Sequence, residues 1–443
     1  MRQVRARQLP LPPLLHSGQS TKELEKMNEI IEANPEIEEL VYSDLIRGVA
    51  PDKGTEGLSA EQVFRALVIK QQNGFSYRDL EFHLNHNAAF QWFCRLPMYR
   101  SVNDSSLERD IKKLRPETLE AINRILVAHA CGKGIEKGQK VRTDCTGVES
   151  LIHEPKDSWL LYDSVRVLTR LTKQAQNLLP TISITDHVCR AKRRNREIEN
   201  TRGQDNKNKL YKDLLKVTRK TVSYAQRAVD ILEARQLAEL SLTCELRNYL
   251  ELARKVIEQT RRRVIDGEKV PADQKVLSIF EPHTDLIVKG KRDPLYGHKV
   301  CLTTGKSGLL IDCQVLDGNP NDTTLAVDAI ERVEQIYGQP PRQAAFDAGF
   351  RSTANLHKIK DLGVEDVVFN RGGDLEIEDM ARSRWVYRQL TRFRAGIEST
   401  VSLLKLALGW IRWTWRSLCS FKSYVWSSAV SANLLTLARA LAT

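Results

Sequence analysis

Apolar residues recur at helical spacing through most of the first third of the chain. After Ser59, a run with a period of three to four residues continues until Asn73-Gly74 interrupts it. Ser76, with Asp79 three residues later, forms a capping-box pattern that opens a second short helix. The pattern predicts an all-helical N-terminal domain over residues 21–135.

The two short helices on either side of Gly74 are open to two interpretations. Their arrangement resembles a helix-turn-helix, in which the second helix reads DNA. The pattern favours the other interpretation, an ordinary helical hairpin, because it recurs in many all-helical domains. Residues 1–20, which contain several prolines, predict an irregular lead before this domain.

The pattern changes after residue 135. A short strand over 139–143 ends at Asp144, and a long polar stretch with helical spacing follows. From about residue 296 strands and helices alternate. The predicted strands are 299–304, 309–315, 343–346, which ends at Asp347, and 366–369, followed by a long helix that carries Arg394 and Glu398. These elements predict an α/β fold, a mixed sheet with flanking helices, interrupted by a helical insertion over 164–280.

The charge of the chain indicates a polyanionic partner. The 443 residues include 68 Lys and Arg against 56 Asp and Glu, a formal net charge of +12. Residues 191–270 hold 20 basic and 12 acidic side chains, so most of the excess lies in the predicted insertion. Nucleic acid is the commonest partner of such a basic segment. The hydrophobic share of 41% rules out a wholly disordered chain.

Basic clusters in and after the insertion are candidates for DNA contacts. Within the insertion, a phosphate-gripping arm and a solvated helical face fit the pattern equally well. Near the C-terminus, basic residues alternate with Trp410, Trp413 and Trp415, which favour core packing over stacking on bases. The candidate DNA-binding residues are Lys192, Arg193, Arg194, Arg261, Arg262, Arg263, Arg412 and Arg416.

The eight cysteines are scattered, and none forms a C-x-x-C pair. This spacing argues against a zinc cluster and against a disulfide framework, and it fits a reducing cytoplasm. The N-terminal apolar stretch is broken by prolines and does not match a signal peptide. The apolar stretch 425–442 is interrupted by polar residues, so it predicts a packed helix and no membrane span.

Three acidic residues stand out by their position. Asp144 and Asp347 each follow a predicted strand, and Glu398 lies in a helix. Carboxylates gathered at one sheet edge can hold two Mg²⁺ ions about 4 Å apart, because hard cations prefer oxygen ligands. Asp312 and Asp317 are weaker candidates, since one falls in mid-strand and the other in a turn.

The helix that carries Glu398 contains a recognisable spacing. Arg394-x₃-Glu398-x₆-Lys405 resembles the Y-x₂-R-x₃-E-x₆-K signature of bacterial insertion-sequence transposases, with Thr391 at the position of the tyrosine. The stretch from residue 141 to the C-terminus resembles the ISNCY-type DDE transposases. Further matching segments are Thr143-Asp144, Val148-Glu149, His153-Glu154-Pro155, Asp347-x-Gly349-Phe350-x-Ser352 and Phe421-Lys422-x-Tyr424-Val425.

The resemblance implies a ribonuclease-H-like catalytic domain over 136–443. In it Asp144, Asp347 and Glu398 are expected to bind two Mg²⁺ ions, with Mn²⁺ as an alternative. Arg394 and Lys405, on the same helix as Glu398, are expected to bring positive charge to the scissile phosphate. The N-terminal domain is then expected to recognise DNA ends or to dimerise, and the insertion to contact the DNA backbone.

The implied activity is that of a DNA transposase: Mg²⁺-dependent cleavage at the ends of an insertion sequence, then transfer of the 3′-hydroxyl into target DNA. The expected partners are double-stranded DNA, both terminal inverted repeats and target, and a homodimer or larger assembly on DNA. The expected location is the cytoplasm, in association with the nucleoid. Two alternatives stay open: a metal-dependent nuclease of the same fold without strand transfer, and a non-catalytic DNA-binding derivative.

Overall fold

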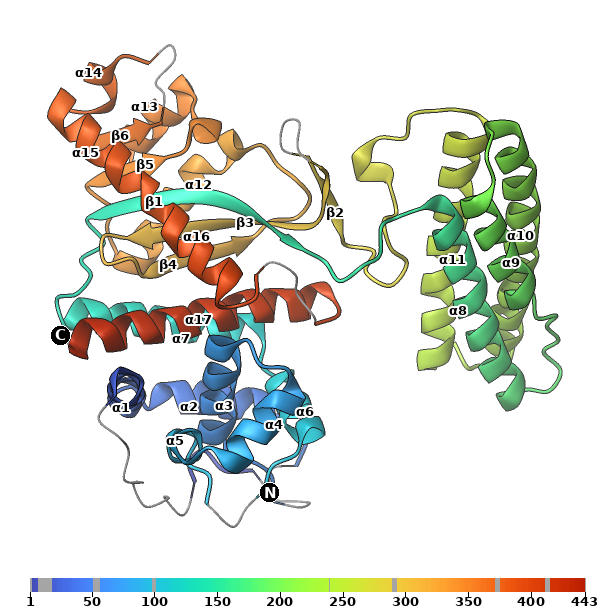
Figure 1. The fold of residues 1–443 in the computed structure, drawn as a ribbon, viewed down its shortest axis with the longest axis horizontal. Coiled ribbons are helices and arrows are strands. Elements are labelled where there is room, and N and C mark those ends of the chain that lie inside the picture. The colour runs from blue at the N-terminus through green and yellow to red at the C-terminus, as the bar shows by residue number, and fades with distance from the viewer. Residues whose placement is uncertain are drawn as a thin grey trace. The chain divides into compact units, whose positions relative to one another are not determined.

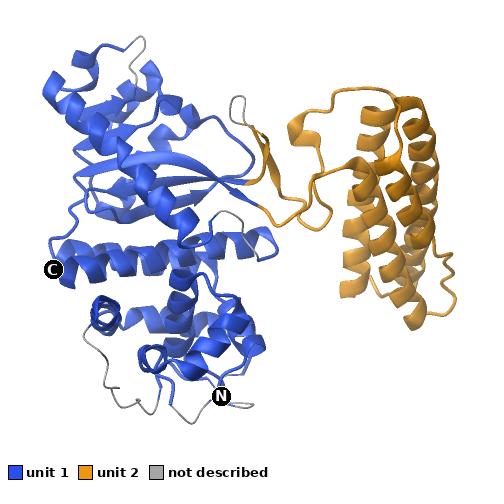
Figure 2. Cartoon of the chain, in the orientation of Figure 1, with its two compact units in different colours: residues 1–149, 298–443 blue, residues 150–297 orange. Residues whose placement is uncertain are grey.

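The structure is a computed structural model. It describes residues 2–6, 18–50, 56–97, 101–238, 240–288, 293–370, 375–410 and 415–442. The chain forms two compact units, each with its own core (Figure 2). The first unit combines residues 1–149 with 298–443, and the second comprises residues 150–297.

A mixed sheet organises the first unit (Figure 1). Its strands are β1 (Lys140–Glu149), β3 (Leu295–Gly305), β4 (Leu310–Val315), β5 (Gln343–Phe346) and β6 (Asp366–Phe369). The strand order is β4-β3-β1-β5-β6, in which β3 and β4 are antiparallel and β1, β5 and β6 are parallel. A short strand, β2 (Asp285–Ile287), pairs with the first residues of β3. The predicted strands are therefore present, and β2 is an addition to them.

Alternating side chains of the parallel strands enter two different cores. Ala344 and Phe346 pack in the core with α12 (Ala326–Tyr337) and α13 (Thr353–Asp361). Ala345 and Val368 pack on the opposite face with α15 (Arg384–Ala395). Because neighbouring side chains of a strand point to opposite faces, an all-apolar strand needs cover on both sides. The remaining short helical elements are η3 (Asp322–Thr324), η4 (Ala348–Phe350), α14 (Ile377–Met380) and α16 (Ile397–Leu406).

Seven helices form the N-terminal part of the first unit. The predicted capping box at Ser76 with Asp79 is present, and the structure adds a second one at Ser59 with Gln62. Pro116 occupies the first turn of its helix. The helices are α1 (Gln19–Glu32), α2 (Glu36–Leu45), α3 (Ala60–Asn73), α4 (Tyr77–His86), α5 (Ala88–Phe93), α6 (Asp104–Ile111) and α7 (Pro116–Gly132).

The C-terminal helix α17 (Leu418–Ala442) joins these helices to the sheet. It packs on α1, α3, α7 and β4, and it is buried on nearly every side. Its apolar residues share one core with the N-terminal helices and with Val300 and Leu310 of the sheet. The N-terminal helices therefore belong to the same compact unit as the sheet, whereas the sequence suggested a division near residue 135. Along the described residues, no helix has both the length and the apolar character needed to cross a bilayer.

Two buried asparagines connect α7, β4 and α17. The Asn433 side chain accepts a hydrogen bond from the Leu310 N–H at 2.8 Å and donates to the Leu310 carbonyl at 2.7 Å. It also donates to Asn123 Oδ1 at 2.7 Å, and Asn123 in turn donates to the Leu310 carbonyl at 3.0 Å. Asn433 thus satisfies backbone groups of β4 that no water can reach.

Replacing Asn433 with Leu is expected to lower the free energy of unfolding by about 2–4 kcal/mol, because it leaves buried polar groups of Leu310 and Asn123 without partners. The midpoint of urea unfolding, followed by circular dichroism, measures this. Ser431→Ala is the matched control on the same helix, since the buried Ser431 hydroxyl has no hydrogen-bond partner. An equal loss of stability in both variants would contradict the role of the asparagines.

The second unit is a helical bundle. Its main helices are α8 (Asp157–Leu178), α9 (Val188–Asn200), α10 (Gln204–Ala234) and α11 (Ser241–Thr260), followed by a π-helical turn, η1 (Arg261–Ile265), and a 3₁₀ turn, η2 (Ala272–Gln274). The four helices bury their apolar faces against one another in a separate core. The unit spans 150–297, wider than the predicted insertion over 164–280, because α8 already begins at Asp157.

Candidate active site

The parallel pairing of β1 and β5 places two of the three predicted carboxylates side by side. The last paired residues are Thr143 and Phe346, so Asp144 and Asp347 come next on the two neighbouring strands. Strand β5 ends there, and Asp347 caps the turn η4. Strand β1 does not end at Asp144, as the sequence suggested, but continues to Glu149.

One guanidinium group contacts all three predicted carboxylates. Arg394 Nη2 lies 3.4 Å from Asp144 Oδ2 and 3.2 Å from Asp347 Oδ1. Arg394 Nη1 lies 3.4 Å from Glu398 Oε1. Because both aspartate oxygens contact the same nitrogen, the distance between these two oxygens cannot exceed the sum of the two contact distances. Residues that lie far apart in the sequence thus surround a single cation, as expected for one site.

The segment that carries Arg394 and Glu398 is not one helix. Arg394 lies in the last turn of α15 and Glu398 in the first turn of α16, with Gly396 between the two helices. The prediction of a continuous helix was therefore wrong, although Arg394 and Glu398 still make contact. Lys405 lies in the last turn of α16 and is partly buried.

Arg142 explains the break between α15 and α16. Its side chain is buried, and it donates from Nη1 to the Phe393 carbonyl at 2.7 Å and from Nε to Thr304 Oγ1 at 2.9 Å. A Cβ atom at Gly396 would collide with the same guanidinium group. Burial lowers the pKa of Arg142. Arg142 thus joins β1, β3 and the end of α15 two residues before Asp144, a role that the sequence did not suggest.

A buried lysine and a third aspartate adjoin Asp347. Asp322, which the sequence suggested as a helix cap, opens η3 and pairs with Lys299 Nζ at 2.6 Å. Lys299 also donates to the Pro320 carbonyl at 2.6 Å. A Cβ at Gly349 would lie only 2.8 Å from Asp322 Oδ2, so glycine permits this close approach. The Asn319-Pro320-Asn321 turn before Asp322 was the only sequence signal for this pair.

The cysteine beside Asp144 has a raised pKa. Its hydrogen bond with Cys301 and its burial both raise the pKa of Cys145. None of the eight cysteines forms a disulfide bond. Asp144, Asp347 and Glu398 offer carboxylate oxygens, the donors that hard divalent cations prefer.

The three carboxylates fit a hard divalent cation by their chemistry. Their side chains are 20%, 40% and 70% exposed for Asp144, Asp347 and Glu398, so ions from solvent can reach them. Within the described ranges, no three His, Cys, Asp or Glu side chains lie close enough to share a metal ion. The Arg394 guanidinium contacts all three carboxylates. A metal ion bound by these three side chains would therefore have to displace it.

The weaker carboxylate candidates have other partners or positions. Asp312 is buried in β4 and accepts hydrogen bonds from Arg332 at 2.6 and 2.7 Å. Asp317 lies exposed in the turn after β4. The predicted ranking of Asp347 above both is consistent with these positions.

Five of the predicted DNA-binding arginines are already paired with acidic side chains of the second unit. Arg193 and Arg194 contact Glu197, and Arg194 also contacts Asp213. The pairs of the second cluster are Arg261 with Glu258 and Asp266, Arg262 with Glu268, and Arg263 with Asp157. Lys192 and Arg416 are exposed, and Arg412, with Trp413, lies outside the described residues.

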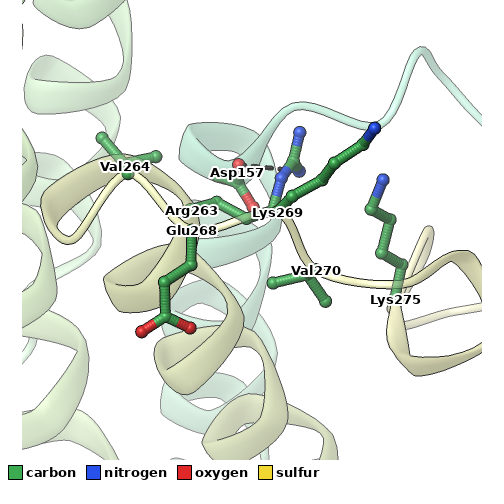
Figure 3. Close-up of a pocket in the computed structure, with 8 residues that line it drawn as sticks. Asp157, Arg263, Val264, Glu268, Lys269, Val270 and Lys275 are labelled. Carbon is green, nitrogen blue, oxygen red and sulfur yellow. Dashed lines mark hydrogen bonds and ion pairs between the residues drawn. The ribbon is translucent and has the colours of Figure 1, made fainter.

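The pair Arg263–Asp157 belongs to a pocket of about 400 Å³ in the second unit (Figure 3). Asp157, which the sequence suggested as an N-cap, is the first residue of α8 and is buried. It accepts hydrogen bonds from Arg263 at 2.9 Å and from Gln259 at 3.0 Å. Asp157 therefore neutralises Arg263, which points toward it in Figure 3.

Two further candidates are explained by their surroundings. His153 is largely exposed and lies 3.4 Å from Asp163, beside the Trp159 ring. Trp410 and Trp415 are buried, so neither forms an exposed stacking platform. Trp410 packs in the core, whereas Trp415 also lines a pocket.

Two family models match the chain. A transposase domain (DUF772) matches residues 15–108, which include the α3–α4 pair, and a transposase DDE domain matches residues 258–434, which include Asp347, Arg394 and Glu398. Asp144 lies before the second match. No curated protein and no solved structure matches the chain.

The DDE family implies a ribonuclease-H-like fold and a metal-dependent polynucleotidyl transferase or endonuclease, in agreement with the mixed sheet. The ISNCY subtype stays a prediction. With the three carboxylates gathered around Arg394, the two matches identify the chain as an insertion-sequence DDE transposase.

Proposed function

We propose that the chain cleaves DNA at the ends of its own insertion sequence and transfers the freed 3′-hydroxyl into target DNA. Asp144, Asp347 and Glu398 are the metal-binding carboxylates of this reaction. The observation that carries the proposal is the contact of one guanidinium, Arg394, with all three side chains. Such a gathering from two strands and a helix has no evident structural purpose, since each carboxylate is partly exposed.

The carboxylates would hold Mg²⁺, as two ions, with Mn²⁺ as an alternative. A divalent ion bound there supplies activation of the attacking oxygen and stabilisation of the leaving oxygen. Arg394, displaced from the carboxylates, and Lys405 bind the scissile phosphate and balance its charge. Arg142 holds the junction of α15 and α16 and so positions both Arg394 and Glu398.

A strand-transfer assay tests the function. The full chain is incubated with labelled terminal-repeat DNA, a target plasmid and MgCl₂, and the products are separated by size. Labelled DNA joined to the plasmid is the expected result. Cleaved ends without joined products would instead support the nuclease of the same fold, and binding without any cleavage would support the non-catalytic derivative.

We propose that the DNA backbone contacts one face of α10. The arginine clusters that the sequence suggested are not the contact surface in this proposal. From residue 209 to 227, six exposed side chains of α10 are basic and the seventh is Ser223. We call these six residues the α10 basic face: Lys209, Lys212, Lys216, Arg219, Lys220 and Arg227.

The spacing of the α10 basic face matches one side of a helix. Lys209, Lys212, Lys216 and Lys220 follow one another at three- and four-residue steps, Arg219 adjoins Lys220, and Arg227 lies two turns further on. The apolar residues between them enter the core of the bundle. None of the six forms an ion pair within the described part of the chain, in contrast to Arg194 or Arg261. At 1.5 Å per residue the face is roughly 27 Å long, enough to follow the phosphates of about eight base pairs.

Replacing Lys212, Lys216 and Arg219 together with Gln is expected to weaken DNA binding and to flatten its salt dependence. Each lost phosphate contact lowers the slope of log K against log salt by about 0.9. Fluorescence anisotropy with terminal-repeat DNA at several NaCl concentrations measures both effects. The matched control replaces the ion-paired Arg193, Arg261 and Arg262 with Gln. A larger loss of DNA binding in the control would show that the arginine clusters, and not α10, contact the DNA backbone.

The remaining parts of the proposal concern assembly and location. The N-terminal helices, including the exposed face of α4, contribute to end recognition or dimerisation. Two DNA ends must be held together for transfer, which a homodimer or larger assembly on DNA provides. Exchange of one phosphodiester for another needs no ATP, and the chain acts in the cytoplasm at the nucleoid.

A further inference from the structure

A pocket in the first unit lies away from the three carboxylates. Its volume is about 410 Å³, and it is lined by the α3–α4 turn, by α6, by the segment after α16 and by α17 (Figure 1). None of the residues assigned above to cleavage or to DNA backbone contact lines it. The residues that matter here are Lys70, Tyr77, Glu108, Lys112, Trp415 and Tyr424.

Lys70 is the distinctive residue of this pocket. Only 6% of it is exposed, and within the described ranges it makes no hydrogen bond and no ion pair. Its ammonium group lies 4.9 Å from the centre of the Tyr77 ring and 5.9 Å from that of Trp415. Burying a cation without a counter-ion is costly, and ring faces offset only part of that cost. A buried, unpaired ammonium that lines a pocket therefore points to an anionic ligand.

The surroundings of Lys70 suit an anion. Lys112 is a second cation that lines the pocket, with its ammonium group 6.0 Å from the centre of the Tyr77 ring, and it pairs with Glu108. The Tyr77 hydroxyl and the Trp415 indole N–H are buried without hydrogen-bond partners.

The walls of the pocket suit a planar ring. Phe75, Tyr77, Trp415 and Tyr424 all line it, and the rings of Trp415 and Tyr424 meet edge to face. Aromatic walls with buried cations are typical of sites that bind a base and its phosphate together. The volume exceeds what a lone phosphate needs.

We propose that this pocket binds a nucleotide unit, with its phosphate at Lys70 and its base against the aromatic walls. The nucleotide can come from a DNA strand end or from the free pool, and both present the same chemistry. The proposal does not depend on the role of Asp144, Asp347 and Glu398. Failure of strand transfer would leave it standing, and its own failure would leave the catalytic proposal unaffected.

Binding of thymidine monophosphate to the full chain tests the proposal. Titration calorimetry is performed in EDTA, so that no divalent ion can bring the nucleotide to the carboxylates. Thymidine monophosphate is expected to bind at least about tenfold more tightly than thymidine, because a charge-assisted hydrogen bond is lost with the phosphate. Lys70→Met is expected to remove this preference, whereas Lys22→Gln, at an exposed lysine of α1, is expected to retain it.

Competition identifies the source of the nucleotide. If a 5′-phosphorylated oligonucleotide displaces thymidine monophosphate at a lower concentration than its unphosphorylated form does, the ligand is a DNA strand end. If neither oligonucleotide displaces it, the ligand is a free nucleotide. Absence of binding, or binding of equal strength in wild type and Lys70→Met, would overturn the proposal.

Two further measurements distinguish loss of the binding site from loss of the folded structure. Lys70→Met removes a buried charge, so its unfolding midpoint is expected to equal or exceed that of the wild type. Trp415→Phe retains the packing and is expected to reduce the quenching of tryptophan fluorescence by thymidine monophosphate. A folded Lys70→Met variant with unchanged affinity for thymidine monophosphate would contradict the proposal, whatever its stability.

The pH dependence of binding gives an independent signature. Burial, and secondly the charge of Lys112, lowers the pKa of Lys70 to about 8. Its charge is therefore present below pH 8 and is lost above it, while the ligand phosphate, with a pKa of about 6, stays ionised. The other charged or titratable groups that face Lys70 are Glu108 and Lys112 of α6, Tyr77 and Tyr424. Burial raises the pKa of both tyrosines, that of Tyr424 to about 12, so they stay neutral. Affinity is expected to fall between pH 7.5 and 9 in the wild type and to stay level in Lys70→Met.

Discussion

Asp144→Asn, Asp347→Asn and Glu398→Gln are each expected to reduce cleavage of terminal-repeat DNA by roughly a thousandfold or more, since groups that act as a unit fail when any one is lost. Each substitution keeps the shape of the side chain and removes only its negative charge. Single-turnover cleavage with MgCl₂ measures the loss. DNA binding is expected to persist, because the proposed contacts lie on α10.

Folding must be checked in the same variants, because each one removes an ion pair with Arg394. These pairs are partly exposed, so their loss is expected to change the free energy of unfolding by only about 1 kcal/mol. Asp317→Asn, in an exposed turn, is the matched control and is expected to cleave at the wild-type rate. A folded triad variant with normal cleavage would exclude that carboxylate from the mechanism.

Local patterns predicted the elements that hold the site. The capping box at Ser76, and the strands that lead to Asp144 and Asp347, could be predicted because their signals lie within a few residues. The spacing of Arg394, Glu398 and Lys405 supplied the third carboxylate. That the three lie together depends on the pairing of β1 with β5, which the order of the elements indicated but did not specify.

Features that depend on distant partners were missed. The basic clusters left a DNA-contacting arm and a solvated face equally open, and their ion pairs could not be predicted: acidic residues from other turns and helices pair with five of these arginines. The basic residues of α10 were included in the charge count of residues 191–270, but they were not recognised as one face of a helix. Their helical spacing could have predicted that face. The helix break at Gly396 could not be foreseen, because its cause is Arg142, more than two hundred residues earlier.

Arg394 makes the carboxylate cluster stable before any metal ion arrives. Without it, three negative side chains would face one another across a small space, and their repulsion would oppose folding. A guanidinium among them supplies the positive charge that, in the proposed reaction, a divalent ion would replace. The same group then competes with the ion, so a variant without it should bind metal more tightly and depend on it more.

Arg394→Gln is therefore expected to unfold at a lower temperature than the wild type without metal, by about 1–2 kcal/mol in free energy, and to regain stability with MgCl₂. A tenfold gain in metal affinity adds about 1.4 kcal/mol when the ion is in excess. Thermal unfolding across a range of MgCl₂ concentrations measures both effects. Arg332→Gln is the matched control: it leaves Asp312 unpaired, so it should lower stability with no recovery in MgCl₂. If Mg²⁺ stabilises Arg394→Gln no more than the wild type, the guanidinium does not hold the place of a metal ion.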